Sequence, residues 1–157
     1  MKLDDLKEKE IEINENGFLK VVEKKTGKFV PKEDERYWFV NEYGEIDYAV
    51  YSDLEMLQWT INHHPVFRTE KEAEEYKDYL DTLDKYKHEF TDEEWKNVNI
   101  EKKHLVFHSD NGEIGLFFEL TVKCPNCVYF NTNEDAENFV KEAGEANVKR
   151  FMFDVWE

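Results

Sequence analysis

The stretch that decides the fold reads YWFVNEYGEID at Tyr37–Asp47 and continues, after a gap, as HPVFRTEKEAEEYKDYL at His64–Leu80. The same pattern returns as HLVFHSDNGEIG at His104–Gly115 and as CVYFNTNEDAENFVKEA at Cys127–Ala143. In both copies a Phe precedes a Gly by the same interval, Gly-Glu-Ile follows, and a later Phe-x-Thr leads to an Ala. The sequence therefore predicts an internal repeat, whose first copy is lengthened within residues 51–63.

Each copy predicts two strands joined by a turn. Aromatic and β-branched residues before the glycine favour a strand. Asn111–Gly112 is a strong hairpin signal because both residue types tolerate positive φ, and Glu42–Gly44 is a looser form of the same turn. We expect the returning strand of the second copy at residues 114–122, and a short apolar run at Pro65–Phe67 or Val128–Phe130 comes next.

A helix is expected to close each copy. Thr69 and Glu72 form a capping box, in which the hydroxyl accepts from the N3 amide and the carboxylate accepts from the cap amide; Thr132 and Asp135 form a weaker one. Gly144 is expected to end the second helix. The apolar helix faces, read from the helical period, consist of Ala73, Tyr76, Leu80 and Leu83 in the first helix and Ala136, Phe139, Val140 and Ala143 in the second.

Three pieces lie outside the repeat. Residues 11–30 predict a hairpin or a meander, residues 90–100 predict a short helical turn, and the apolar run Phe151–Trp156 is a last strand or a packed tail. The predicted fold class is α+β, with antiparallel sheets that carry helices on one face. We expect one compact domain over residues 1–157, made of an N-terminal hairpin extension (1–30), a first copy (31–86), a linker (87–103) and a second copy (104–157).

Composition excludes several classes of protein. The 157 residues are 40% hydrophobic and 15% aromatic, enough for a core and too much for a disordered chain. There are 37 acidic and 21 basic residues, so the formal net charge of -16 repels nucleic acid and anionic membranes and favours basic partners. No stretch has the length of a membrane span, and the N-terminus lacks the apolar region of a signal peptide, which predicts a cytoplasmic protein.

The side chains give little sign of catalysis. No nucleophile motif and no glycine-rich phosphate loop occurs, so we expect no enzyme and no cofactor. Cys124 and Cys127, with His104 and His108 on one strand face, are weak candidates for a tetrahedral zinc site, but their order matches no common zinc module. The other interpretation is a Pro-Asn turn flanked by cysteines. A redox pair is disfavoured because a strand, and not a helix N-terminus, is expected after the cysteines.

Part of the chain resembles a known family. Tyr37–Trp38 before a Gly turn, VFRTEKEAE at Val66–Glu74 and the later VYF at Val128–Phe130 resemble small phage and prophage proteins of low-GC Gram-positive bacteria. That family has a YW strand, an FxTxEEAE helix and a VYF strand before a second helix. The resemblance covers residues 31–150, and it implies a mobile-element origin and action in the cytoplasm of an infected host, without a particular chemistry.

These observations lead to a functional hypothesis. A folded surface of carboxylates attracts a protein that grips DNA through Lys and Arg. We therefore expect an inhibitor of a host defence nuclease, either a CRISPR effector or a restriction enzyme, that occupies the basic nucleic-acid-binding surface of its partner and binds no nucleic acid itself. Exposed aromatic residues, for which Tyr43 is a further candidate, would assist. The candidate contact residues are Glu42, Glu45, Asp47, Tyr48, Tyr51, Asp53, Glu55, Trp59, Glu70, Glu74, Glu75 and Asp78.

Three other interpretations stay open at this stage. The acidity can serve solubility alone. The protein can be an accessory interaction module in phage replication or assembly, with the repeat as a scaffold. It can also be a small metal-binding or redox protein that uses the Cys-x-x-Cys segment at Cys124–Cys127.

Overall fold

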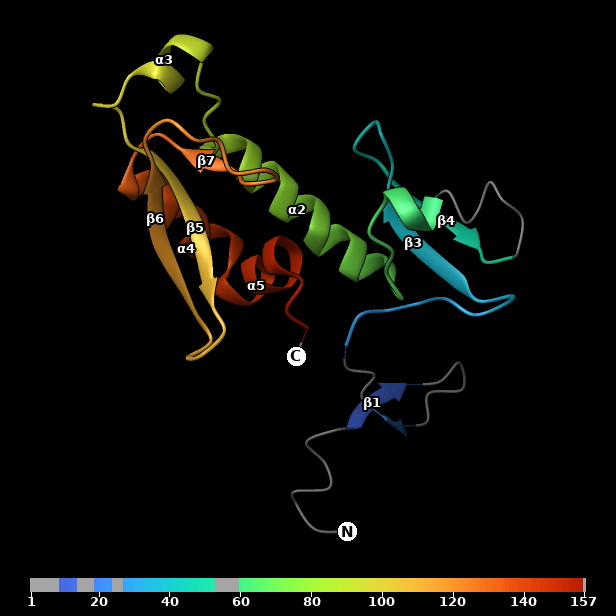
Figure 1. Cartoon of the computed structure of the whole chain (residues 1–157). Coiled ribbons are helices and arrows are strands. Elements are labelled where there is room, and N and C mark those ends of the chain that lie inside the picture. Colours follow the sequence, from blue (N-terminus) through green and yellow to red (C-terminus); the bar gives the residue numbers. More distant parts are fainter. Residues whose placement is uncertain (1–8, 14–18, 24–26, 53–59, 157) are drawn as a thin grey trace. The chain divides into compact units, whose positions relative to one another are not determined.

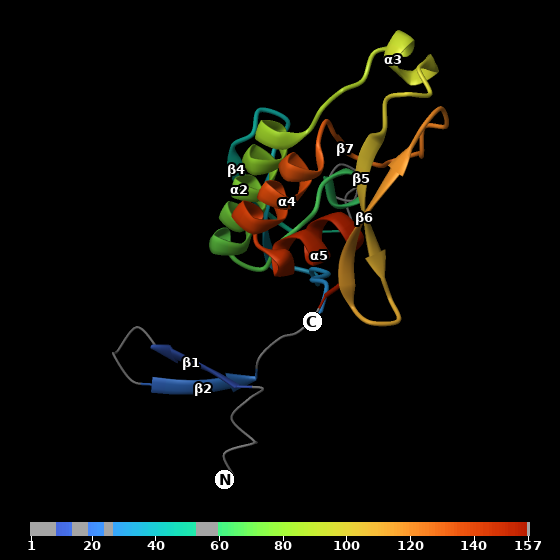
Figure 2. The ribbon, with the colours of Figure 1, turned by 90° about the vertical axis from the view of Figure 1, so that its left-hand side faces the viewer.

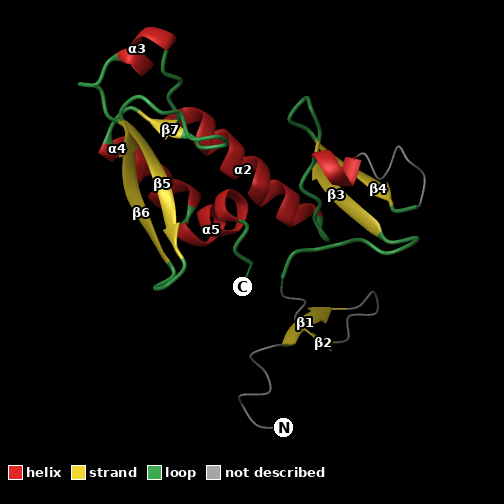
Figure 3. Cartoon of the chain, in the orientation of Figure 1, coloured by secondary structure: helices red, strands yellow, loops and turns green. Residues whose placement is uncertain are grey.

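The computed structural model describes residues 9–13, 19–23, 27–52 and 60–156, and the α+β class is confirmed (Figures 1 and 3). The chain divides into two units, Phe29–Val155 and a smaller one made of Met1–Lys28 with Trp156–Glu157. In the smaller unit β1 (Lys9–Ile13) pairs antiparallel with β2 (Leu19–Glu23), as expected for a hairpin. No helix in the described ranges has both the length and the apolar character needed to cross a bilayer.

The first part of the larger unit is a hairpin followed by a helix. β3 (Arg36–Val40) pairs antiparallel with β4 (Ile46–Val50), and residues 60–63 are helical. Phe67 forms an antiparallel bridge with Trp38 of β3 through two backbone hydrogen bonds of 2.9 and 2.8 Å. α2 (Glu70–Tyr86) follows, and its predicted capping box is confirmed. The apolar face of α2 is wider than predicted, because Tyr79 is buried as well as Ala73.

The second part repeats this order of elements. β5 (Lys102–His108) pairs antiparallel with β6 (Glu113–Glu119), and the short β7 (Tyr129–Phe130) pairs with the other edge of β5. α4 (Asn133–Ala143) begins with a complete capping box at Thr132, where we expected a weaker one. The internal repeat itself stays a prediction. β6 ends at Glu119, so the returning strand is shorter than the predicted range 114–122.

The C-terminal run forms a helix. α5 (Glu145–Phe153) includes Phe151–Phe153, so the prediction of a last strand is wrong there. Gly144, at φ 85°, is both the C-cap of α4 and the N-cap of α5, a conformation that glycine adopts without steric cost. The predicted helical turn in the linker is confirmed as α3 (Asp92–Lys96), with a capping box of Thr91 and Glu94.

Helix α2 connects the two sheets of the larger unit. It contacts β3 and β4 as well as α4 and α5 (Figures 1 and 2). Phe151 of α5 lies between Phe67 and Tyr79, with ring centroids 5.9 and 5.2 Å away, and Tyr79 meets Phe139 of α4 at 5.8 Å. This chain of aromatic rings joins the core of the hairpin to that of the three-stranded sheet. At the other end of α2, Tyr86 donates a hydrogen bond of 2.6 Å to Glu142.

Candidate binding surface

The turn between β3 and β4 presents carboxylates beside an aromatic ring. The Asn41 side-chain oxygen accepts from the amides of Tyr43 and Glu45, both at 3.0 Å, and Gly44 has φ 75°. These bonds hold the turn, so Glu42 and Glu45 are exposed and Tyr43 is 80% exposed. A largely exposed tyrosine flanked by acids on a hydrogen-bonded turn is a suitable contact for a protein partner.

The other predicted contact residues of the β3–β4 hairpin differ in their exposure and in the contacts that hold them. Asp47 is exposed. Tyr48 is also exposed, but its ring packs 5.2 Å from Trp38 and under the Arg36 guanidinium at 4.7 Å. Tyr51 is half-buried and fixed by its backbone, whose amide donates to the Glu35 carbonyl at 2.9 Å. The remaining candidates of this segment, Asp53, Glu55 and Trp59, lie outside the described residues.

The outer face of α2 carries a row of carboxylates. Glu70, Glu74 and Asp78 are exposed and follow one another at intervals of one helical turn. The three span about 12 Å of helix, a length over which one strand of B-DNA carries about four phosphates. Glu75 does not belong to this row, because it is half-buried and its Oε2 accepts from the Arg150 guanidinium at 2.8 Å. The row thus offers a line of negative charge along the helix, with a spacing of about 6 Å that is wider than the roughly 3.4 Å of phosphates along one DNA strand.

The cysteines lie in a tight turn. The Cys127 amide donates to the Cys124 carbonyl at 3.4 Å, Asn126 has φ 61°, and the Cys124 amide donates to the Tyr129 hydroxyl at 2.7 Å. The turn matches the Pro-Asn interpretation. Burial raises the pKa of the Cys127 thiol to about 11, and a hydrogen bond with Cys124 and the negative charge of Glu119 act in the same direction. The thiol therefore stays protonated at neutral pH.

The histidine candidates do not complete a metal site. His104 is buried, with Nε2 3.7 Å from Glu119 Oε1, whereas His108 is exposed at the far end of β5. Over the ranges that the structure describes, no three His, Cys, Asp or Glu side chains come together in a group able to hold a metal ion. This arrangement gives no support to the zinc interpretation.

The protonation of Cys127 leads to a testable result. Because the pKa of its thiol is raised to about 11, its thiolate fraction at pH 8 is far below that of an ordinary cysteine. We expect alkylation of Cys127 by iodoacetamide at pH 8 to be at least about tenfold slower in the folded protein than in urea, with the difference narrowing as the pH approaches 11. Peptide mass spectrometry measures each cysteine separately, and equal rates in the two states would contradict the burial of the thiol.

Lys102 of β5 is buried, which the sequence analysis did not predict. Lys102 has no exposed side-chain surface, and its ammonium donates to the carbonyls of Asn97 and Leu120 at 2.9 and 2.5 Å. The ammonium also lies 5.4 Å from the Trp95 ring centre. Strand alternation places Lys102 on the same face of β5 as the buried His104.

Comparison with protein-family models, with curated proteins and with solved structures gives no match for this chain. The resemblance to phage proteins therefore stays an expectation, and arguments about function rest on the surfaces described above.

Proposed function

We propose that this chain is a non-catalytic binding protein that inhibits a host defence nuclease, a CRISPR effector or a restriction enzyme, by covering its basic nucleic-acid-binding surface. The observation that carries the proposal is the row of exposed carboxylates Glu70, Glu74 and Asp78 on α2, which places three negative charges in line over about 12 Å of helix. The exposed Tyr43, between Glu42 and Glu45, supplies an aromatic contact at a second place.

The physical basis of the inhibition is competition for the same cations. A nuclease that binds DNA releases counterions from phosphate, and a folded carboxylate surface offers its Lys and Arg residues an alternative partner. A net charge of -16 also accelerates the encounter with a basic protein and weakens association between copies of this chain. Both effects fall as salt rises, so salt sensitivity distinguishes this mode from apolar docking.

A pair of matched variants tests the proposal. The triple variant Glu70→Gln, Glu74→Gln, Asp78→Asn removes the row on α2. The control Glu33→Gln, Glu89→Gln, Asp110→Asn removes the same charge from three exposed positions elsewhere. We expect the concentration for half-inhibition of DNA cleavage to rise at least about tenfold for the α2 variant and less than about twofold for the control, since each lost contact costs a fraction of a kcal/mol and the three act together.

Two results would contradict the proposal. One is that the wild-type protein, added to a panel of purified CRISPR effectors and restriction enzymes, leaves their DNA binding and DNA cleavage unchanged. The other is an equal loss of inhibition in the two triple variants, which would reduce the effect to net charge. Retention of phage replication or assembly proteins in a pull-down, with no nuclease inhibited, would favour the accessory interaction module instead.

A further inference from the structure

Strand β6 is an open edge of the three-stranded sheet. The sheet order is β6-β5-β7, so β6 pairs with β5 on one side, and among the described residues no strand pairs with its other side. An unpaired edge leaves backbone amides and carbonyls available to another chain. Large apolar side chains stay exposed along and beyond this strand, with 55% of Phe117 and 43% of Phe118 accessible. The edge is thus suited to strand addition.

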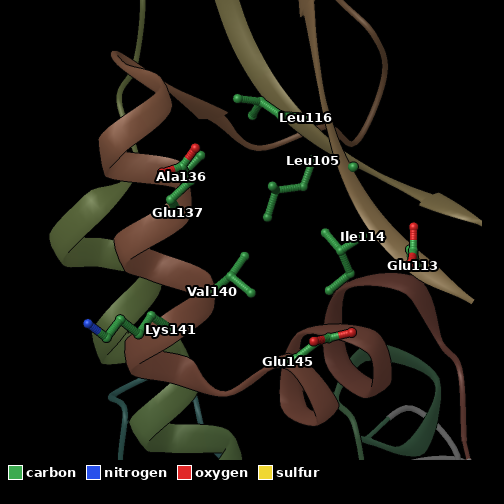
Figure 4. Close-up of a pocket in the computed structure, with 10 residues that line it drawn as sticks. Leu105, Glu113, Ile114, Leu116, Ala136, Glu137, Val140, Lys141 and Glu145 are labelled. Carbon is green, nitrogen blue, oxygen red and sulfur yellow. The ribbon is translucent and has the colours of Figure 1, made fainter.

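A groove with apolar and charged walls runs along the inner face of this strand. Its volume is about 630 Å³, and its walls are β6, Leu105 of β5, helix α4 and Glu145 at the start of α5 (Figure 4). The charged residues that line it are Glu113, Glu137, Lys141 and Glu145. Ile114 and Leu116 of β6 and Val140 of α4 project into the space between sheet and helix. Ile114 and Leu116 are half-buried at the border of the core, and both also line the groove, so part of the inner face of β6 stays accessible beside α4.

The outer face of β6 has a different character. Side chains alternate between the two faces of a strand, so Glu113, Phe117 and Glu119 lie opposite to Ile114 and Leu116. Gly115 lies between Glu113 and Phe117 on the outer face. The imidazole of His108 occupies the space there that a Cβ would take. Carboxylates therefore stand at both ends of the outer face, and Glu137 on α4 adds another beside the groove.

We propose that β6 is a docking site for an extended segment of a partner protein in which apolar and basic residues alternate. The segment pairs its backbone with the free edge of β6. Its apolar side chains enter the groove beside Ile114 and Leu116, and its Lys or Arg side chains face Glu113 and Glu119 on the other side. Charge complementarity selects this occupant over a second copy of the chain, which carries the same charge of -16.

This inference goes beyond inhibition of a nuclease, because it concerns a different surface and a backbone interaction that a carboxylate row does not provide. The two proposals also fail separately. The α2 row is judged by DNA cleavage, whereas the β6 edge is judged by direct binding of a short peptide, with no nuclease present.

The experiment uses a fluorescent peptide of sequence Lys-Val-Lys-Val-Lys-Val-Lys with the full chain, followed by anisotropy at about 0.15 M salt. Alternate amides of a strand point to opposite edges, so two further peptides carry N-methyl groups on all valines or on all lysines. We expect one of the two methylated peptides to lose at least about tenfold in affinity and the other to bind as the parent does, since only one set of amides faces β6. The block peptide Lys-Lys-Lys-Lys-Val-Val-Val, of equal charge, is expected to bind at least about tenfold more weakly.

Protein variants locate the site. Glu113→Lys is expected to weaken the parent peptide about fivefold, while Glu33→Lys, the same change at an exposed position outside the α2 row, weakens it less than about twofold. Equal effects of the two methylations, equal binding of the block peptide, or equal losses in the two protein variants would each overturn the proposal. The first of these results is also the one expected if the groove holds an amphipathic helix.

Discussion

We expect the Phe139→Ala variant to lose about 4 kcal/mol of unfolding free energy, because truncating a large aromatic side chain in a closed core removes its burial and leaves a cavity. Phe139 has no exposed surface, and its ring meets those of Tyr79 and Phe130 at 5.8 and 5.5 Å. It therefore contributes where α2, α4 and the three-stranded sheet meet. Urea denaturation followed by circular dichroism measures the change.

Two companion variants keep this prediction open to test if the alanine variant does not fold, since domains of this size are stable by about 5–15 kcal/mol. Phe139→Leu keeps most of the volume and is expected to cost about 1.5 kcal/mol. Phe117→Ala removes the same side chain from a position that is 55% exposed, and we expect a loss below about 1 kcal/mol. A similar loss for Phe117→Ala and Phe139→Ala would show that α4 does not close the core as described.

The second large effect concerns the buried lysine. We expect Lys102→Ala to lower the free energy of unfolding by about 3 kcal/mol, because it leaves the Asn97 and Leu120 carbonyls without their donor and opens a cavity beside Trp95. Chemical denaturation with two probes, the fluorescence of the four tryptophans and circular dichroism, measures this change.

The contributions of the Lys102 ammonium and of its apolar methylene chain to the free energy of unfolding can be separated. Lys102→Met keeps the apolar stem and removes the ammonium, so we expect about half of the loss seen for alanine. Lys123→Ala, at an exposed position, is expected to change the stability by less than about 0.5 kcal/mol. A loss below about 1 kcal/mol for Lys102→Ala would mean that the ammonium does not hold α3 and residue 120 against β5.

Local sequence signals were sufficient to predict most of the helices and strands. Thr69 and Glu72, Thr91 and Glu94, and the Asn111–Gly112 turn act within a few residues, so the helix starts and the hairpin were predictable. The capping box at Thr132 was underestimated, because Asp135 closes it as fully as a Glu does.

The features that the sequence did not predict correctly have a common physical cause, which is tertiary packing. Phe151–Phe153 has the composition of a strand, but Gly144 restarts a helix and Phe151 packs against α2. Tyr79 is buried because α2 is covered from more than one side, so a single apolar stripe describes it poorly.

The candidate surface was predictable in part. Exposed acids on a turn and on a capped helix follow from local sequence, as Glu45 and Glu74 show. The pairing of Glu75 with Arg150 and the burial of Lys102 depend on partners far along the chain, which no periodicity reveals. The open edge of β6 depends on strand order in the sheet, and that order follows from the pairing of β7 with β5.

The single residue between α4 and α5, Gly144, is the hinge about which α5 would rotate. Because Gly144 caps both helices, the direction of α5 relative to α4 depends on very few backbone angles. α5 has 9 residues and is about 13 Å long, so a rotation of about 30° at Gly144 would swing its far end by about 7 Å. Such a swing would take Phe151 out from between Phe67 and Tyr79. The backbone geometry at one glycine thus sets whether Phe151 packs into the aromatic cluster of Phe67, Tyr76 and Tyr79.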